Sequence, residues 1–420
     1  MSIQPGKIFG LLLYGIFGIV QQAEAESEFG TSVNGSLRGA YFTSSRDLDD
    51  VDSIGGTALW IKAKSALSSN ASLTAEGWAQ YEGARNSHKS QAKVREAYLD
   101  LSLGKLDVRL GKQIIAWGRA DKLNPTDNLT PRDYTLQVID DEEQRLGATA
   151  AMFHYPLQGN DLVLTGVWMP RINRNVVPIS RPPGIVFSES VPNTNQFAIK
   201  LDRSGGGLDW SLSYLNGVNL NPELELSGVS SNGVAVLMRH KRVSVLGMDA
   251  ATVVGRYGLR AEVAYTWIKA DTNLSDLHTN KPFFYLVLGG DRTFDTGVNV
   301  NLQYFLYRVS GYVDPRGIVD PLSRSIGIEN AIAAHQLDPR QHGVSFRVSK
   351  KWLNDTLEGE IAGILSLSAS DFTLKPRLIY AMSDQIKVSA GLDLFRGDRN
   401  TFFGRLKDTS TAFVELRYSF

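Results

Sequence analysis

The chain has 420 residues, and its 44 lysines and arginines balance its 44 aspartates and glutamates. This neutral composition gives no reason to expect a nucleic-acid partner. Cysteine is absent, which excludes disulfides, thiol catalysis and zinc sites built on cysteine.

Residues 1–25 have the features of a secretory signal peptide. Lys7 supplies a short basic region, 8–20 form an apolar stretch too short to span a bilayer, and Ala23-Glu24-Ala25 fits a small-x-small cleavage site. We therefore expect residues 26–420 to form one exported domain. No later stretch approaches eighteen uninterrupted apolar residues, which argues against a helical membrane protein.

From about residue 31 onward, the chain alternates between apolar and polar side chains. Leu259, Val263 and Trp267, for example, alternate with Arg260 and Glu262. A period of two is typical of β-strands with one apolar face. The pattern predicts about eighteen strands, at 31–43, 57–66, 71–83, 93–103, 106–114, 143–155, 161–169, 195–202, 208–216, 240–254, 259–269, 282–290, 296–307, 341–352, 357–367, 372–382, 386–396 and 410–420.

The connections between these strands alternate between short and long. Tight turns rich in Gly, Asn, Asp and Pro make every second connection. Among the others, the long ones are 114–142, 170–194, 217–239 and 308–340. Outer-membrane barrels sort their loops in this way, with the short turns at the periplasmic rim, and a soluble sandwich has no reason to do so. The sequence therefore predicts an all-β fold, a transmembrane antiparallel β-barrel with an even number of strands, in contact with outer-membrane lipid and lipopolysaccharide.

The last strand supports this interpretation. Leu416, Tyr418 and Phe420 lie on one apolar face, and the chain ends on the aromatic residue. This ending resembles the carboxyl-terminal signal by which the barrel-assembly machinery recognises bacterial outer-membrane barrels. Taken alone, the stretch also fits a half-buried strand of a soluble sandwich.

The segment 114–142 combines charged and apolar side chains with two prolines and many Asn and Asp residues, which is typical of an ordered loop. In a barrel of about eighteen strands the lumen is wide enough to receive it. We expect this loop, the third connection at the long-loop rim and hereafter the third long loop, to fold into the lumen and constrict the pore. The candidate residues for the constriction and for solute contact are Arg109, Gln113, Trp117, Arg119, Asp121, Lys122, Asp127, Arg132, Asp133 and Arg145. Alternatively, Asp127, Arg132 and Asp133 only cap turns and bridge the loop to the wall.

Around this loop the chain resembles a family of uncharacterised Gram-negative outer-membrane proteins known only as a domain of unknown function. The resemblance rests on Gly111, Gln113, Trp117, Gly118, Asp121, Pro131-Arg132-Asp133, Arg145, Trp168 and Pro170. The family more often has Glu after Trp-Gly, where this sequence has Arg119. The resemblance implies a porin-like barrel, more distantly similar to polysaccharide-export and alginate-export channels, without a known substrate.

Other constellations are weak. The six histidines show no metal-ligand spacing, and no cofactor motif is present, so we expect neither a metal nor a cofactor. Ser87-His88 and the acidic run 140–143 are the nearest candidates for a hydrolase at the long-loop rim, although a solvated loop and a hydrated rim explain them more simply. Residues 323–336 fit a short amphipathic helix that caps or plugs the pore.

Three functions remain open at this point. The first is a porin-like channel, not an enzyme, for passive diffusion of a small solute of unknown identity. The second is an outer-membrane conduit that exports a polysaccharide or another compound with periplasmic or inner-membrane partners. The third is the hydrolase. A homo-oligomer and a monomer fit the sequence equally.

Overall fold

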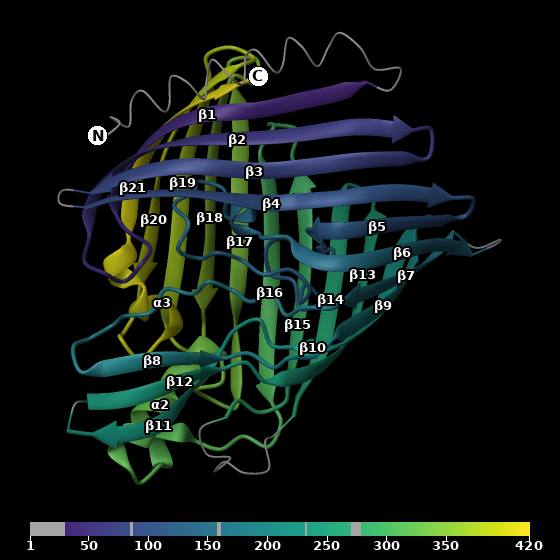
Figure 1. Ribbon diagram of the computed structural model, residues 1–420. Helices are drawn as coiled ribbons and strands as arrows, with labels where there is room; N and C mark the ends of the chain where they lie inside the picture. Colours follow the sequence, from purple (N-terminus) through teal and green to yellow (C-terminus); the bar gives the residue numbers. More distant parts are fainter. Residues whose placement is uncertain (1–29, 85–86, 158–160, 232, 270–278) are drawn as a thin grey trace, which may run out of the picture.

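Eighteen antiparallel strands form a closed barrel in the part of the chain that the computed structural model describes, which is residues 30–84, 87–157, 161–231, 233–269 and 279–420 (Figure 1). The expected signal peptide, 1–25, lies outside the described residues. The barrel strands are β1 (Thr31–Ser44), β2 (Asp52–Ser68), β3 (Ala71–Ala84), β4 (Ser87–Leu103), β5 (Leu106–Gln113), β6 (Ala148–Leu157), β7 (Leu162–Met169), β9 (Gln196–Arg203), β10 (Leu208–Val218), β13 (Arg242–Val254), β14 (Tyr257–Ile268), β15 (Phe283–Thr293), β16 (Asn299–Val309), β17 (Arg340–Trp352), β18 (Leu357–Ser366), β19 (Asp371–Ala381), β20 (Ile386–Arg396) and β21 (Thr411–Ser419). This confirms the predicted barrel and its strand number.

The barrel closes where the first strand meets the last. β1 pairs with β2 on one side and with β21 on the other. At the seam the Gly35 N–H donates to the Phe420 carbonyl at 2.9 Å, and the Phe420 N–H donates to the Gly35 carbonyl at 3.1 Å. A Cβ at Gly35 would lie 2.3 Å from the Trp60 carbonyl oxygen and 2.8 Å from the ring of Phe420, so only glycine fits at this position. Closure leaves no sheet edge without a partner.

The two faces of the wall differ as the alternation predicts. Leu259 and Trp267 on β14 are exposed on the outside, whereas Glu262 between them is buried inside. Large exposed apolar side chains recur on the outer face of most other strands. Such a surface suits lipid and not water, as in membrane barrels. Among the described residues, no helix is long and apolar enough to cross a membrane.

The two rims also differ. At one rim, eight turns of two to five residues join consecutive strands, and the chain also reaches its end there. At the other rim the long connections are 114–147, 170–195, 219–241 and 310–339. The predicted loop asymmetry is therefore confirmed, although the connections 85–86 and 367–370 at the long-loop rim are short.

The long loops build an accessory sheet that the sequence analysis did not predict. Its strands are β8 (Ile185–Ser190), β11 (Glu223–Ser230) and β12 (Gly233–Arg239). β8 comes from a different loop than β11 and β12, and it pairs in parallel with β12. In Figure 1 this sheet lies beyond the long-loop end of the barrel strands, next to α2 (Pro321–Ala333).

The helix α2 confirms the helix expected near 323–336. Asp320 caps its first turn by accepting a hydrogen bond from the Ser323 N–H at 2.8 Å, and Pro321 occupies the first helical position. Asn330 joins the helix to β11, because its side chain accepts from the Leu224 N–H at 2.7 Å and donates to the Leu224 carbonyl at 2.8 Å.

Three predicted strand starts were wrong by five or more residues, because β2 and β4 begin earlier than the expected residues 57 and 93, and β6 begins later than expected. The strand expected from residue 143 begins at Ala148, because Asp141–Gln144 form the short 3-10 helix η1. Asp140 caps η1 by accepting from the Glu142 N–H at 3.1 Å. The acidic run therefore starts a turn and does not extend the strand.

Candidate functional site

The loop 114–147 joins β5 to β6, which are neighbours, yet its side chains reach strands far around the barrel. Arg119 pairs with Asp202 on β9 and with Asp249 on β13. Glu143 pairs with Arg38 on β1 and with Arg417 on β21. Because β9 and β21 lie about halfway round the barrel from each other in strand order, the loop crosses the lumen. The structure therefore confirms that the third long loop folds inward.

A single wall carboxylate holds the middle of the loop. Glu262 on β14 is 1% exposed and accepts four hydrogen bonds from the loop. The donors are the backbone N–H groups of Arg119 and Ala120, both at 3.1 Å, and the N–H and hydroxyl of Thr126, both at 2.8 Å. Hydrogen bonds to a charged acceptor are roughly twice as strong as neutral ones, so this contact fixes the position of the loop against the wall.

The Trp-Gly pair of the loop is explained by the same contact. Gly118 has φ +98°, a conformation that side chains rarely adopt, and a Cβ there would lie 2.6 Å from both carboxylate oxygens of Glu262. Trp117 next to it is buried in an apolar cluster with Met152 and Val167 on β6 and β7. The indole anchors the loop on one wall, and the glycine lets the backbone wrap around the carboxylate of another.

Ion pairs tie further parts of the loop to the wall. Asp121 contacts Arg347 on β17 at 2.8 Å. Asp133 contacts Lys93 on β4 at 2.7 Å, and it also accepts hydrogen bonds from the N–H and hydroxyl of Thr135. Asp133 thus caps a turn and bridges to the wall at once.

A second group of charges sits where the loop returns to β6. Arg145 contacts Asp127 at 2.5 Å and Glu142 at 2.6 Å, and Arg132 contacts Glu142 at 3.0 Å. Burial alone would raise the pKa of the Glu142 carboxyl, but the two guanidinium groups hold it below its usual value. These contacts tie the middle of the loop to the segment that returns to β6.

Asp141 ties η1 to the wall near β19. It contacts Lys375 at 2.6 Å and Arg46 at 3.6 Å. Burial would raise its pKa, but Lys375, Arg46 and Arg377 hold the pKa well below the usual range. A carboxylate held ionised between cations is a structural anchor and a poor general base.

The remaining candidate residues lie apart from these contacts. Gln113 is 0% exposed and donates to the Ala150 carbonyl at 3.0 Å. Arg109 is on β5, where it contacts Asp100 at 2.6 Å and lies over the Tyr98 ring. Lys122 is exposed, has φ +68°, and makes no ion pair within the described residues. Lys122 and Asp140 are the exposed charged side chains of this loop.

The wall partners Asp202, Asp249 and Arg347 were missing from the sequence prediction. Alternation places each of them on the lumen face, so their orientation was predictable. Which loop residues they contact was not predictable, because the contacts join residues more than eighty positions apart in the chain.

At the outer surface, Leu416, Tyr418 and Phe420 lie exposed on the lipid-facing side of β21 and the chain end. Within the described residues, no group of three or more His, Cys, Asp or Glu side chains could hold a metal ion. The side chains of Ser87 and His88 lie outside the described part of the structure.

Comparison with known proteins places the chain in a family. A family model described as "Protein of unknown function (DUF1302)" matches residues 60–313. The chain belongs to this family. No curated protein matches it.

Two solved structures illustrate the likeness of this DUF1302 barrel to others. OccAB4 of Acinetobacter baumannii is 11% identical, with a TM-score of 0.55 over 94% of this chain and 99% of that chain. OccK11 (OpdR) of Pseudomonas aeruginosa is 10% identical, with a TM-score of 0.53 over 93% of this chain and 95% of that chain. At such identity the likeness concerns the fold alone, and it agrees with a porin-like barrel over nearly the whole chain.

Proposed function

We propose that this protein is a channel of the cell outer membrane through which small polar solutes diffuse passively, without enzymatic activity. The observation that carries the proposal is a closed wall of eighteen strands whose lumen is crossed by a loop fixed to opposite sides. A wall of this size encloses an aqueous lumen when its outer face is apolar. The short turns then face the periplasm and the accessory sheet faces the outside.

In this proposal the loop 114–147 is the constriction. Its anchors are ion pairs and hydrogen bonds to β4, β9, β13, β14, β17 and β19. A segment held at so many points stays in the lumen and leaves passage only beside it. Lys122, exposed and without an ion pair in the described residues, is the side chain we expect a passing solute to meet.

We expect weak charge selectivity. Arg119, Asp121, Asp133 and Asp141 carry both signs and are each paired with an opposite charge on the wall. Paired charges present little net field to an ion in the lumen. The passage is therefore suited to small solutes of either sign or of none.

We also expect the outer face to contact lipid and lipopolysaccharide, and the exposed row Leu416, Tyr418 and Phe420 to be recognised by the barrel-assembly machinery. An export conduit would need a partner-sized surface at the short-turn rim, where turns have only two to five residues. The diffusive channel therefore explains more of the structure than export does.

The test is single-channel conductance in planar bilayers. We expect the intact protein to conduct and a variant lacking residues 119–133 to conduct more, because the deletion removes the segment that fills the lumen. The matched control is Arg316→Ala, which alters a loop charge whose partners Asp314 and Asp338 belong to its own loop. Folded protein that conducts neither intact nor after the deletion would overturn the proposal.

A further inference from the structure

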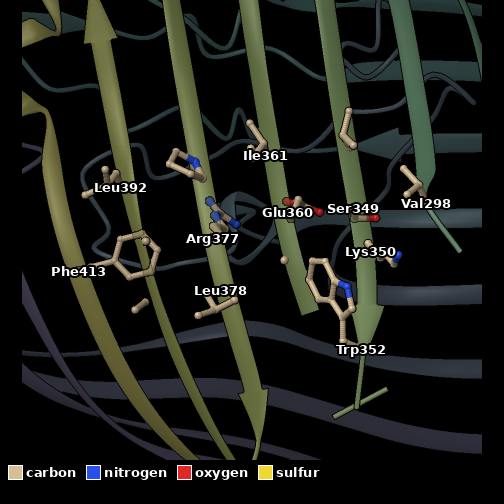
Figure 2. A pocket seen from close by; sticks show the side chains of 15 residues that line it. Val298, Ser349, Lys350, Trp352, Glu360, Ile361, Arg377, Leu378, Leu392 and Phe413 are labelled. Atoms are coloured by element: carbon tan, nitrogen blue, oxygen red, sulfur yellow. The ribbon is translucent and has the colours of Figure 1, made fainter. Parts of the chain in front are cut away.

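A groove lies on the outer face of the barrel across β17, β18, β19 and β20 (Figure 2). It has a volume of about 760 Å³, within the range of roughly 300–1,000 Å³ that is typical of ligand sites. Its apolar walls are Trp352, Ile361, Leu378 and Leu392, all exposed on the side that we assign to lipid.

Two of the outward positions that line the groove, Gly359 and Ala390, are small. The indole of Trp352 packs over Gly359, where an added Cβ would lie 2.9 Å from the ring. Leu378 lies between Gly359 and Ala390 on β19, and Pro376 is the next outward residue of that strand, opposite Ile361. Proline lacks the N–H that a strand interior needs, and the pairing of β19 with β20 stops at Leu374 and resumes at Arg377. The β19–β20 hydrogen-bond ladder is thus interrupted beside the groove.

A basic side chain, Lys350, lies at the end of the groove near the short-turn rim. Lys350 lines the groove, shares the outward face of β17 with Trp352, and has its ammonium 5.8 Å from that ring. Among the described residues it makes no ion pair. Because β17 ends at Trp352, the Lys350 Cα lies roughly 7 Å from the strand end at about 3.4 Å per residue, so this basic side chain belongs to the rim region, where lipid headgroups are expected.

We propose that this groove binds an anionic phospholipid of the leaflet at the short-turn rim. One acyl chain lies along Ile361, Leu378 and Leu392, and the phosphate contacts the Lys350 ammonium beside the Trp352 ring. An apolar groove alone would accept any hydrocarbon, but the adjacent unpaired cation complements an anionic headgroup. A second copy of the barrel is a poorer occupant, because it would bury the Lys350 charge against a largely apolar surface.

This inference goes beyond the proposed channel: it rests on the outer-membrane location in that proposal and not on conduction. The groove is outside the barrel, and the lumen loop contributes nothing to its lining. Loss of lipid binding would leave conductance unchanged, and loss of conductance would leave lipid binding unchanged.

Native mass spectrometry of the detergent-purified protein tests the site, with dioleoylphosphatidylglycerol as the added probe. We expect one lipid to bind more tightly than the rest. Lys350→Gln should weaken it about five-fold, equivalent to the ~1 kcal/mol of a basic side chain near an anionic lipid surface. Ala390→Phe, which fills the groove from a lipid-facing position, should abolish this tight binding.

The matched control is Lys351→Gln, since Lys351 is next along the same strand but pairs on the lumen face opposite Glu358. It should bind the lipid as the unmodified protein does. Heat-modifiable migration on gels verifies that every variant is folded. Equal affinity of the Lys350→Gln and Lys351→Gln variants, unchanged binding after Ala390→Phe, or a dimer that Ala390→Phe dissociates would each overturn the proposal.

Discussion

At the scale of single residues, the lumen loop depends on a few buried charges. Asp249 on β13 is 1% exposed and is satisfied by Arg119 and by the Ser211 hydroxyl. Arg119 also reaches Asp202 on β9. Removing one partner of a buried pair leaves an uncompensated charge, which costs more than the pair contributes.

Arg119→Ala should therefore destabilise the barrel. We expect a loss near the lower end of about 3–5 kcal/mol, because the guanidinium itself is 19% exposed. Urea unfolding of the protein in lipid vesicles, followed by tryptophan fluorescence, measures the loss.

The control for this variant is Arg256→Ala. Arg256 and Asp295 form an ion pair between two turns, with 65% and 86% of their side chains exposed. Exposed pairs contribute about 0–1 kcal/mol. If both variants lost the same stability, the loop anchor would have no special role.

Lys122→Glu should change ion selectivity without changing stability. Lys122 is exposed and unpaired among the described residues, so reversing its charge alters the field that a passing ion meets. The reversal potential in a potassium chloride gradient should shift toward cation preference, with Lys122→Gln intermediate. An unchanged reversal potential in both variants would place Lys122 away from the ion path.

At the scale of elements, the accessory sheet depends on burial of an acid. Glu223 begins β11, is 1% exposed, and has one carboxylate oxygen without a hydrogen-bond partner. Burial raises its pKa to about 7 from 4.5, although the nearby Lys241 opposes the shift. The neutral acid is the form that this buried position favours.

The accessory sheet should consequently lose stability as the pH rises from about 4.5 to 7. In that window the folded sheet retains a proton on Glu223 that the unfolded segment has released, so raising the pH favours opening; above 7 the dependence ends. Amide hydrogen exchange of β11, corrected for intrinsic rates, measures the free energy of opening at pH 5.5 and 7.5.

Glu223→Gln should remove this pH dependence, and Asp338→Asn, at a carboxylate 38% exposed in a neighbouring loop, should preserve it. A dependence that persists in the Glu223→Gln variant would assign the effect to another group.

At the scale of the whole molecule, the strands and the loop asymmetry could be predicted because each depends on the residues of its own segment. A period of two places Leu259 outside and Glu262 inside whatever the partner strands are. The accessory sheet could not be predicted, since β8 and β12 belong to two different loops. Nothing in the residues of either segment indicates that it pairs with the other. The inward direction of the lumen loop was predictable from its length and composition, but its anchor Glu262 was not, because only the folded barrel brings Glu262 to Thr126.

Phe420→Ser should reduce the amount of barrel inserted in the membrane of cells. The side chain is exposed on the lipid side, while only the backbone closes the seam with Gly35. The substitution removes the aromatic side chain that we propose as a recognition element and keeps the two backbone hydrogen bonds. Cell fractionation with heat-modifiable gel migration measures the folded fraction, and refolding of purified protein into vesicles should change much less. Equal losses in cells and in vesicles would indicate that Phe420 acts through stability alone.

The parallel pairing of β8 with β12 has a consequence for how this surface diverges among related proteins. Hairpin loops on a barrel usually vary independently, because each is bonded only to itself. Here six residues of one loop are matched in register with six of another, from Val234 opposite Ile185 to Arg239 opposite Ser190. An insertion in either loop would shift that register, so the two loops are structurally coupled, and chimeras that exchange one without the other should misfold in the accessory sheet.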